Sequence, residues 1–119
     1  MSYDIHIEDS AGQLIEFNSP VDLRGGTYQL GGTREAWLNI TYNYSPYFYE
    51  YIDPEKGIRW LYGRTVKECI PKLESAISVL GTKRAEDYWQ NTAGNAGAAL
   101  NDLLMMAKLC PEDAIITGD

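Results

Sequence analysis

Hydrophobic and polar residues alternate along several short stretches of the chain, which is the pattern of half-buried strands. Residues 3–8 alternate in this way, and a turn at residues 10–12 leads into residues 14–17, so we expect an opening hairpin. Residues 114–117 predict a last strand near the end of the sequence.

The stretch at residues 36–43 alternates as well, and its polar positions form the most informative pattern in the chain. In a strand, Asn39, Thr41 and Asn43 would share one face, with about 7 Å between neighbours. Amide and hydroxyl groups both donate and accept hydrogen bonds, so such a row can read the edge of a nucleobase or a sugar. The same pattern also fits a plain solvent-facing strand, and the sequence leaves both interpretations open.

Two longer stretches have hydrophobic residues at helical spacing and carry the signals of helix ends. Thr65 and Glu68 match a capping box, and the helix that they open is expected to end at Gly81. Pro71 is expected to kink this helix or to mark its true start.

A second long helix is expected between Thr92, which can cap it, and Pro111, which stops it. Small residues at positions 97–99 leave its first turns thin, which suits the close approach of another backbone or of a ligand. Shorter helices are expected after Ser45, which can act as a cap, and around residues 85–90.

The order of these elements is strands, helix, helices and strand, which predicts an α+β fold. We expect one domain over residues 1–119, built from a small antiparallel sheet with two main helices packed on one of its faces.

The formal net charge is −7, and it is unevenly spread along the sequence. Residues 1–55 carry a balance of −7, residues 56–84 carry +5 and residues 85–119 carry −5. This pattern indicates an acidic body with one basic segment. Direct binding to duplex nucleic acid is not expected, because the summed field repels phosphates.

The composition indicates a globular protein of the cytoplasm. The first residues are polar and acidic, unlike a secretory signal, and no apolar run approaches the roughly 20 residues of a membrane span. Cys69 and Cys110 lie among apolar residues and are expected to be reduced thiols. Because His6 is the single histidine, no zinc-type cluster is present, and we expect neither a metal nor a cofactor.

The sequence carries no catalytic signature. A nucleophilic triad lacks partners for the lone imidazole of His6, and adjacent carboxylates such as Glu8 and Asp9 fit solvated loops better than acid–base pairs. The glycine-rich segment 24–34 is expected to form two turns, and a strand follows it, whereas phosphate-binding loops open onto a helix. We therefore expect a protein that is not an enzyme.

Aromatic, cationic and polar residues from separate segments form a candidate ligand-binding set. Aromatic rings offer faces for stacking, arginines can contact a phosphate or carboxylate, and amides at a helix start favour an anion. Each residue also has an ordinary structural explanation, as core packing, as a partner of the acidic body or as a helix cap. The set comprises Asn39, Thr41, Asn43, Tyr44, Tyr47, Arg59, Trp60, Arg64, Trp89, Thr92 and Asn95, with Tyr62 and Tyr88 as further rings.

Three stretches carry a resemblance: the NIT-x-N strand at residues 39–43, GIRWLYGRT at residues 57–65, and the helix entry NTAGNAGAAL at residues 91–100 with its leucines and closing Pro111. Together they resemble a loose family of small proteins encoded by phages and prophages, over residues 36–111. The resemblance implies a setting, in which small phage proteins act against host immunity, and it implies no catalytic residues.

These observations favour a non-enzymatic, phage-type accessory protein that counters host defence by binding and sequestering a small nucleotide-like ligand. In this hypothesis the ligand lies at or near an oligomer interface, in the cytoplasm of a bacterial host, with no contact to a membrane. The alternative is an acidic inhibitor of a host defence effector or nuclease, acting as a nucleic-acid mimic or a CRISPR-type inhibitor. A small nucleotide-acting enzyme and a phage structural component are further alternatives.

Overall fold

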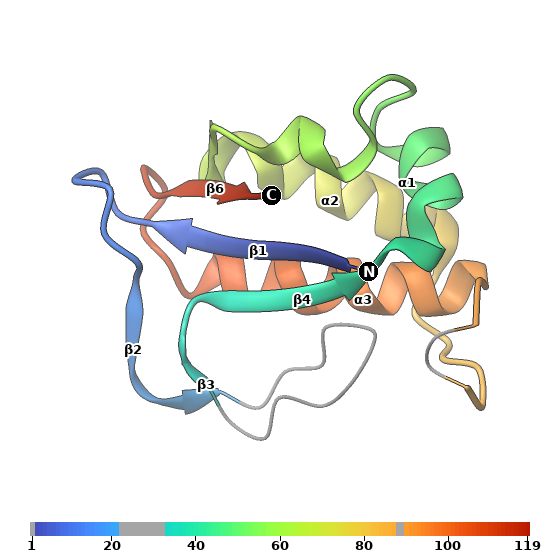
Figure 1. Cartoon of the computed structure of the whole chain (residues 1–119), viewed down its shortest axis with the longest axis horizontal. Helices are drawn as coiled ribbons and strands as arrows, with labels where there is room; N and C mark the ends of the chain where they lie inside the picture. Colours follow the sequence, from blue (N-terminus) through green and yellow to red (C-terminus); the bar gives the residue numbers. More distant parts are fainter. Residues whose placement is uncertain (1, 22–32, 88–89) are drawn as a thin grey trace.

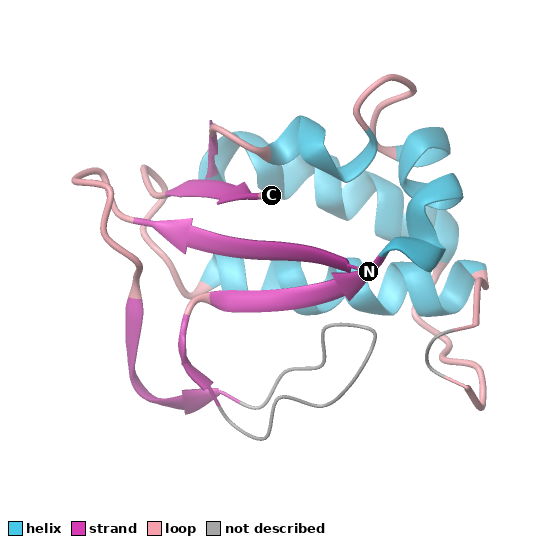
Figure 2. Ribbon diagram, viewed as in Figure 1, coloured by secondary structure: helices cyan, strands magenta, loops and turns pink. Residues whose placement is uncertain are grey.

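The computed structural model describes residues 2–21, 33–87 and 90–119, shown in Figures 1 and 2. Among these residues the main sheet has four antiparallel strands in the order β4-β1-β6-β5. A separate two-stranded pair is formed by β2 and β3. The strands are β1 (Ser2–Glu8), β2 (Glu16–Val21), β3 (Thr33–Glu35), β4 (Trp37–Thr41), β5 (Arg64–Thr65) and β6 (Ile115–Gly118).

Two helices cover one face of the main sheet. Figure 1 shows α2 and α3 side by side behind the strands, while α1 follows β4 at the end of the sheet where β1 begins. This arrangement is α+β, and it confirms the predicted fold class. The helices are α1 (Ser45–Tyr51), α2 (Val66–Leu80) and α3 (Ala93–Lys108), with the 3₁₀ helices η1 (Tyr42–Tyr44) and η2 (Gly57–Leu61).

The alternation in β1 determines which side chains face the helices. Tyr3, Ile5 and Ile7 are at most 3% exposed, and they join Ile40 of β4 in the core. Their polar neighbours point to the opposite face of the sheet, which no helix of the described ranges covers (Figure 1). The predicted half-buried strand is therefore confirmed.

The first long helix begins and ends where the sequence predicts. Thr65 Oγ1 accepts a hydrogen bond from the Glu68 N–H (3.2 Å), and the Glu68 carboxylate completes the capping box at the Thr65 N–H. α2 begins at Val66, so Pro71 does not mark its start. Gly81 follows the last turn with a φ of 74°, a conformation that favours a residue without Cβ.

The first turns of α3, which have small side chains, pack directly against the backbone that follows α2. A Cβ on Gly97 would overlap the carbonyl oxygen of Gly81, and one on Gly94 would overlap that of Lys83. The sequence leaves open whether another backbone or a ligand approaches these turns. In the structure it is the backbone that follows α2.

The predicted strand at residues 36–43 ends early, at Thr41. Thr41 Oγ1 accepts a hydrogen bond from the Asn43 N–H (3.2 Å) and caps η1, so the chain turns instead of continuing along β1. Ser45 is the first residue of α1 and not its cap, and its hydroxyl donates to the Tyr42 backbone oxygen (2.7 Å).

Three further predictions about local structure have different outcomes. The opening hairpin is reduced to one bridge, between Glu8 and Leu14, before the chain leaves to form β2. The short helix predicted at residues 85–90 is wrong for the described part, since residues 85–87 and 90 are not helical. Most of the glycine-rich segment 24–34 lies outside the described residues.

Candidate functional site

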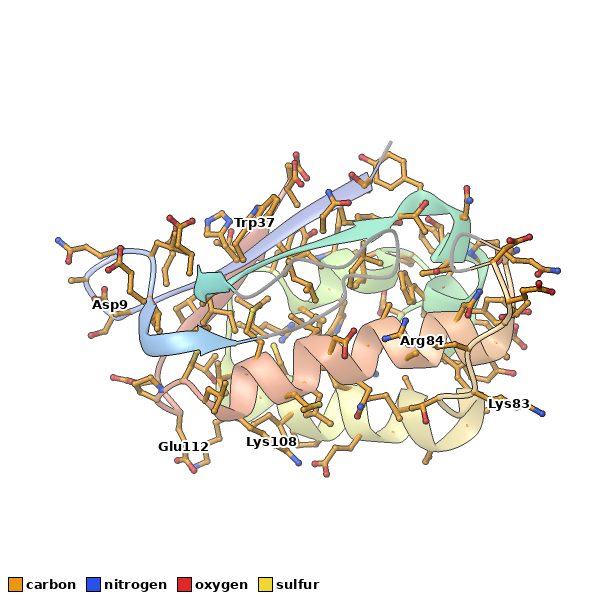
Figure 3. All side chains as sticks on the ribbon, turned by 90° about the horizontal axis from the view of Figure 1, so that it is seen from below. Asp9, Trp37, Lys83, Arg84, Lys108 and Glu112 are labelled. Carbon is orange, nitrogen blue, oxygen red and sulfur yellow. The ribbon has the colours of Figure 1, made fainter. Side chains whose placement is uncertain are left out.

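The face of the main sheet opposite the helices carries side chains of β1 and of its two neighbours, β4 and β6. Asp4 lies opposite Asn39 and His6 opposite Trp37, while on its other side His6 lies opposite Thr117. Figure 3 shows Trp37 on the side of the sheet away from the helices. All five side chains are partly exposed, so this open face can contact a molecule from outside.

Asn39 is the residue of the predicted polar row that lies on the open face. Its Nδ2 donates hydrogen bonds to Asp4 Oδ1 (2.7 Å) and to Ser2 Oγ (2.6 Å). Thr41 is only 6% exposed, and Asn43 belongs to η1. The row of three polar groups therefore does not form, because the cap of η1 uses the Thr41 hydroxyl and turns the chain.

A cation lies at the end of the main sheet where β1 begins. The guanidinium of Arg59 lies over two tyrosine rings, with Cζ 4.9 Å from the Tyr3 centroid and 5.8 Å from the Tyr42 centroid. Its Nε donates to the backbone oxygen of Asp119 (3.1 Å), and its Nη2 donates to the Tyr42 hydroxyl (3.4 Å). Although Arg59 is exposed, these contacts give its side chain a defined position.

Arg59 forms no ion pair with an Asp or Glu side chain of the described residues within 4.0 Å. A guanidinium has several N–H groups in a planar fork, and two of them have acceptors in this structure. The others point to no acceptor within the described ranges, so they can bind an anion that approaches from outside.

Hydrogen bonds connect Arg59 to Asn39 through two acidic residues. The Asp4 N–H donates to Asp119 Oδ1 (3.0 Å), and Asn39 holds the Asp4 carboxylate from the neighbouring strand. The Asp119 backbone oxygen accepts from Arg59 and from the Tyr62 hydroxyl (3.3 Å). We call these residues the Arg59 network; it consists of Asp4, Asn39, Tyr42, Arg59, Tyr62 and Asp119.

Tyr62 is a neutral phenol in this network. Burial raises the pKa of its hydroxyl well above the ordinary value; Arg59 opposes this shift in part and Asp119 adds to it. The hydroxyl is therefore protonated at neutral pH and acts as a hydrogen-bond donor to Asp119.

Trp60 and Arg64 belong to a separate cluster with Lys72 of α2. Arg64 Cζ lies 3.8 Å from the Trp60 ring centroid, and Lys72 Nζ lies 4.9 Å from it. Arg64 Nε also donates to the Trp60 backbone oxygen (2.8 Å). The indole that the sequence suggests as a stacking platform is thus in contact with two cations of the chain itself.

Tyrosines predicted as a stacking rim pack in the core. Tyr44 is 0% exposed and meets Phe48 edge-on, with ring centroids 6.3 Å apart. Tyr47 is half-buried and packs against the same core. Trp89 lies outside the described residues. The rings beside Arg59 are therefore not the ones that the sequence indicates first.

Thr92 and Asn95 hold the start of α3 together. Thr92 Oγ1 accepts a hydrogen bond from the Asn95 N–H (3.1 Å), which confirms the predicted cap. The Asn95 side chain is 0% exposed, and its Oδ1 accepts from the Ala85 N–H (2.8 Å). Its Nδ2 donates to the backbone oxygens of Asp87 and Gln90 (2.9 Å each). These bonds occupy the Asn95 amide, so it is not available for the predicted ligand contact.

The two cysteines are not activated as nucleophiles. Burial raises the pKa of the Cys69 thiol to about 12 and that of the Cys110 thiol to about 11, so both are protonated at neutral pH. His6 Nε2 lies 3.1 Å from Glu8 Oε1 on the open face. Within the described ranges, no three His, Cys, Asp or Glu side chains are grouped to hold a metal ion.

The sequence does not single out Asp4, Tyr42 or Asp119 as members of a site. Alternation places Asp4 on the polar face of its strand, but only the register of β1 against β4 places it opposite Asn39. Nothing in the sequence marks Asp119, which reaches the network through the pairing of β6 with β1.

No family model matches the chain, and neither a curated protein nor a solved structure is significantly similar to it. In the part of the chain that the structure describes, none of the helices has the length and hydrophobicity of a membrane span. The geometry of the Arg59 network is therefore the basis for a proposed function.

Proposed function

We propose that this chain is a non-enzymatic binding protein that sequesters a small nucleotide-like molecule, with Arg59 holding an anionic group of that molecule. The observation that carries the proposal is the position of the Arg59 guanidinium, which lies over two rings, donates to two acceptors and forms no ion pair with an Asp or Glu side chain in the described ranges. An arginine held in this way has already lost side-chain freedom, so binding an anion costs less entropy.

The other members of the network supply complementary contacts. The Asp4 carboxylate, held by the Asn39 amide, can accept hydrogen bonds from a sugar hydroxyl or a base amino group. Tyr42 and Tyr62 are half-buried rings beside Arg59, and stacking of a base on an aromatic ring contributes about 1–3 kcal/mol. A nucleotide combines an anion, hydrogen-bond donors and a flat ring, and so fits all of these groups.

The biological setting of the proposal comes from the resemblance to small phage proteins. We infer that the ligand is a signalling nucleotide of bacterial immunity, and that its sequestration counters host defence in the bacterial cytoplasm. A second copy of the chain, packed at the open face, would enclose the ligand.

Arg59→Gln is expected to abolish the preference for a phosphorylated ligand and to leave the fold intact, because the Arg59 side chain is exposed. Isothermal titration calorimetry with adenosine monophosphate as the probe and adenosine as the uncharged comparison measures this preference. We expect the wild type to bind the monophosphate at least about tenfold more tightly than adenosine, since a charge-assisted contact is lost with the phosphate.

The matched control is Lys56→Gln, which removes the same charge from an exposed side chain outside the network. It is expected to bind like the wild type. Equal losses in Lys56→Gln and Arg59→Gln, or a wild type that does not prefer the monophosphate, would contradict the proposal.

An acidic inhibitor of a protein with a basic groove is the second candidate. It is favoured by Asp4 and Glu8, two carboxylates on the same open face of β1. In that case Asp4→Asn combined with Glu8→Gln weakens binding to a basic nuclease groove, Arg59→Gln does not, and binding falls steeply as salt rises.

A further inference from the structure

A second cluster of cations lies on η2, β5 and α2, outside the Arg59 network. The Arg64 guanidinium lies over the Trp60 ring, 3.8 Å from its centroid, and the bond from Arg64 Nε to the Trp60 backbone oxygen (2.8 Å) fixes its plane. Lys72 Nζ lies 4.9 Å from the same centroid. Two cations from different elements therefore share one half-buried indole.

The positive charge of this cluster is only partly compensated. Glu68 Oε2 lies 3.7 Å from Arg64 Nη1, but the two side chains are 55% and 37% exposed, and Glu68 Oε1 contacts the cap of α2. An exposed pair of this kind contributes little. Lys72 forms no ion pair within 4.0 Å in the described ranges. The cluster lies in the segment 56–84, whose charge balance is +5.

We propose that Trp60, Arg64 and Lys72 form a docking surface for a short acidic stretch of a partner protein. One carboxylate of that stretch would bind the fork of Arg64 and a second would bind the Lys72 ammonium, while their methylene groups would lie against the indole. The fixed plane of Arg64 suits this contact, because a guanidinium binds a carboxylate through two parallel hydrogen bonds.

A short acidic peptide fits this surface better than a nucleic acid. The chain as a whole carries −7 and repels a long polyanion, whereas a short stretch experiences chiefly the local field of the basic segment. The proposal does not depend on the Arg59 network, because the two clusters share no residue.

Fluorescence anisotropy with a labelled oligoglutamate peptide of about ten residues tests the proposal at low ionic strength, where surface charge contacts are strongest. The wild type is expected to bind the peptide saturably. Arg64→Gln combined with Lys72→Gln is expected to weaken binding by about tenfold or more, as two charge-assisted contacts are lost. Lys72→Gln alone keeps the bond from Arg64 to Trp60 and is expected to give an intermediate loss.

The matched control is Lys83→Gln combined with Lys108→Gln, which removes the same charge from two exposed lysines that lie far from each other (Figure 3). It is expected to bind within about twofold of the wild type, since neither lysine belongs to the cluster of Trp60, Arg64 and Lys72 and the exposed pair of Lys108 with Glu74 (4.0 Å) contributes little. Three results would each overturn the proposal: no saturable binding by the wild type, an equal loss in this control, or an oligothymidylate strand that binds as tightly as the peptide.

Discussion

Replacing Asn95 with alanine is expected to lower the free energy of unfolding by about 2–3 kcal/mol. The side chain is fully buried, and its amide makes three hydrogen bonds to the backbone between α2 and α3. Without it, the N–H of Ala85 loses its partner, and the carbonyl groups of Asp87 and Gln90 each keep one hydrogen bond, from the N–H of Gln90 and of Thr92. The described residues of this connection have no regular secondary structure that would replace those bonds.

Urea denaturation of Asn95→Ala beside Asn101→Ala measures this effect. Asn101 is in the same helix, but it is partly exposed and its amide contacts the sulfur of Met105 (3.7 Å). Its replacement is expected to change the free energy of unfolding by less than about 0.5 kcal/mol. If the two variants are equally stable, the Asn95 amide does not hold the connection, and the ligand contact predicted from the sequence becomes tenable again.

Gly97→Ala is expected to destabilise the protein by about 2 kcal/mol, because overpacking between close elements forces the backbone to move. The added methyl group would overlap the Gly81 carbonyl oxygen and lie 3.0 Å from Leu80 Cβ. The sign of the change in stability is informative, because alanine ordinarily stabilises a helix by up to about 1 kcal/mol relative to glycine. The start of α3 and the end of α2 would have to separate.

Thermal and urea unfolding of Gly97→Ala, with Ser75→Ala as the control, show whether the free energy of unfolding falls or rises. Ser75 is exposed on α2, so its replacement is expected to be neutral or slightly stabilising. A Gly97→Ala protein as stable as the wild type would contradict the close approach of the two backbones that the structure shows.

Much of the fold follows from signals that are local in the sequence. The capping box of Thr65 and Glu68 and the cap at Thr92 depend on neighbours a few positions away. The small residues of α3 form a short stretch of the sequence, although Gly97 meets the backbone of Gly81. Such signals act on the backbone directly, through hydrogen bonds to helix ends or through the space that a Cβ would need. The α+β class could be predicted from them together with the alternation in β1.

The end of β4 shows the limit of alternation as a signal. Residues 36–43 alternate throughout, yet the ladder stops at Thr41 because its hydroxyl bonds to the Asn43 N–H. A threonine side chain can cap a turn or lie on a strand, and the choice depends on what the following residues pack against. Here Tyr44, the residue after Asn43, becomes fully buried in the core.

The Arg59 network could not be assembled from the sequence, since it joins residues from both ends of the chain and from the middle. The contact between Asp4 and Asn39 depends on strand register, and the contact between Arg59 and Asp119 depends on where η2 packs. Asn95 is the opposite case: the sequence suggests a ligand-binding residue, but its side chain forms hydrogen bonds to the protein's own backbone.

Native mass spectrometry of the purified protein, after incubation with a small-molecule extract of bacteria whose defence systems are activated, shows whether the Arg59 network holds a ligand. We expect an added mass of a few hundred daltons on the wild type and on Lys56→Gln, and none on Arg59→Gln. The same spectra give the number of copies in the complex. No added mass on the wild type, or the same added mass on Arg59→Gln, would contradict the claim that the Arg59 network holds a small anionic ligand.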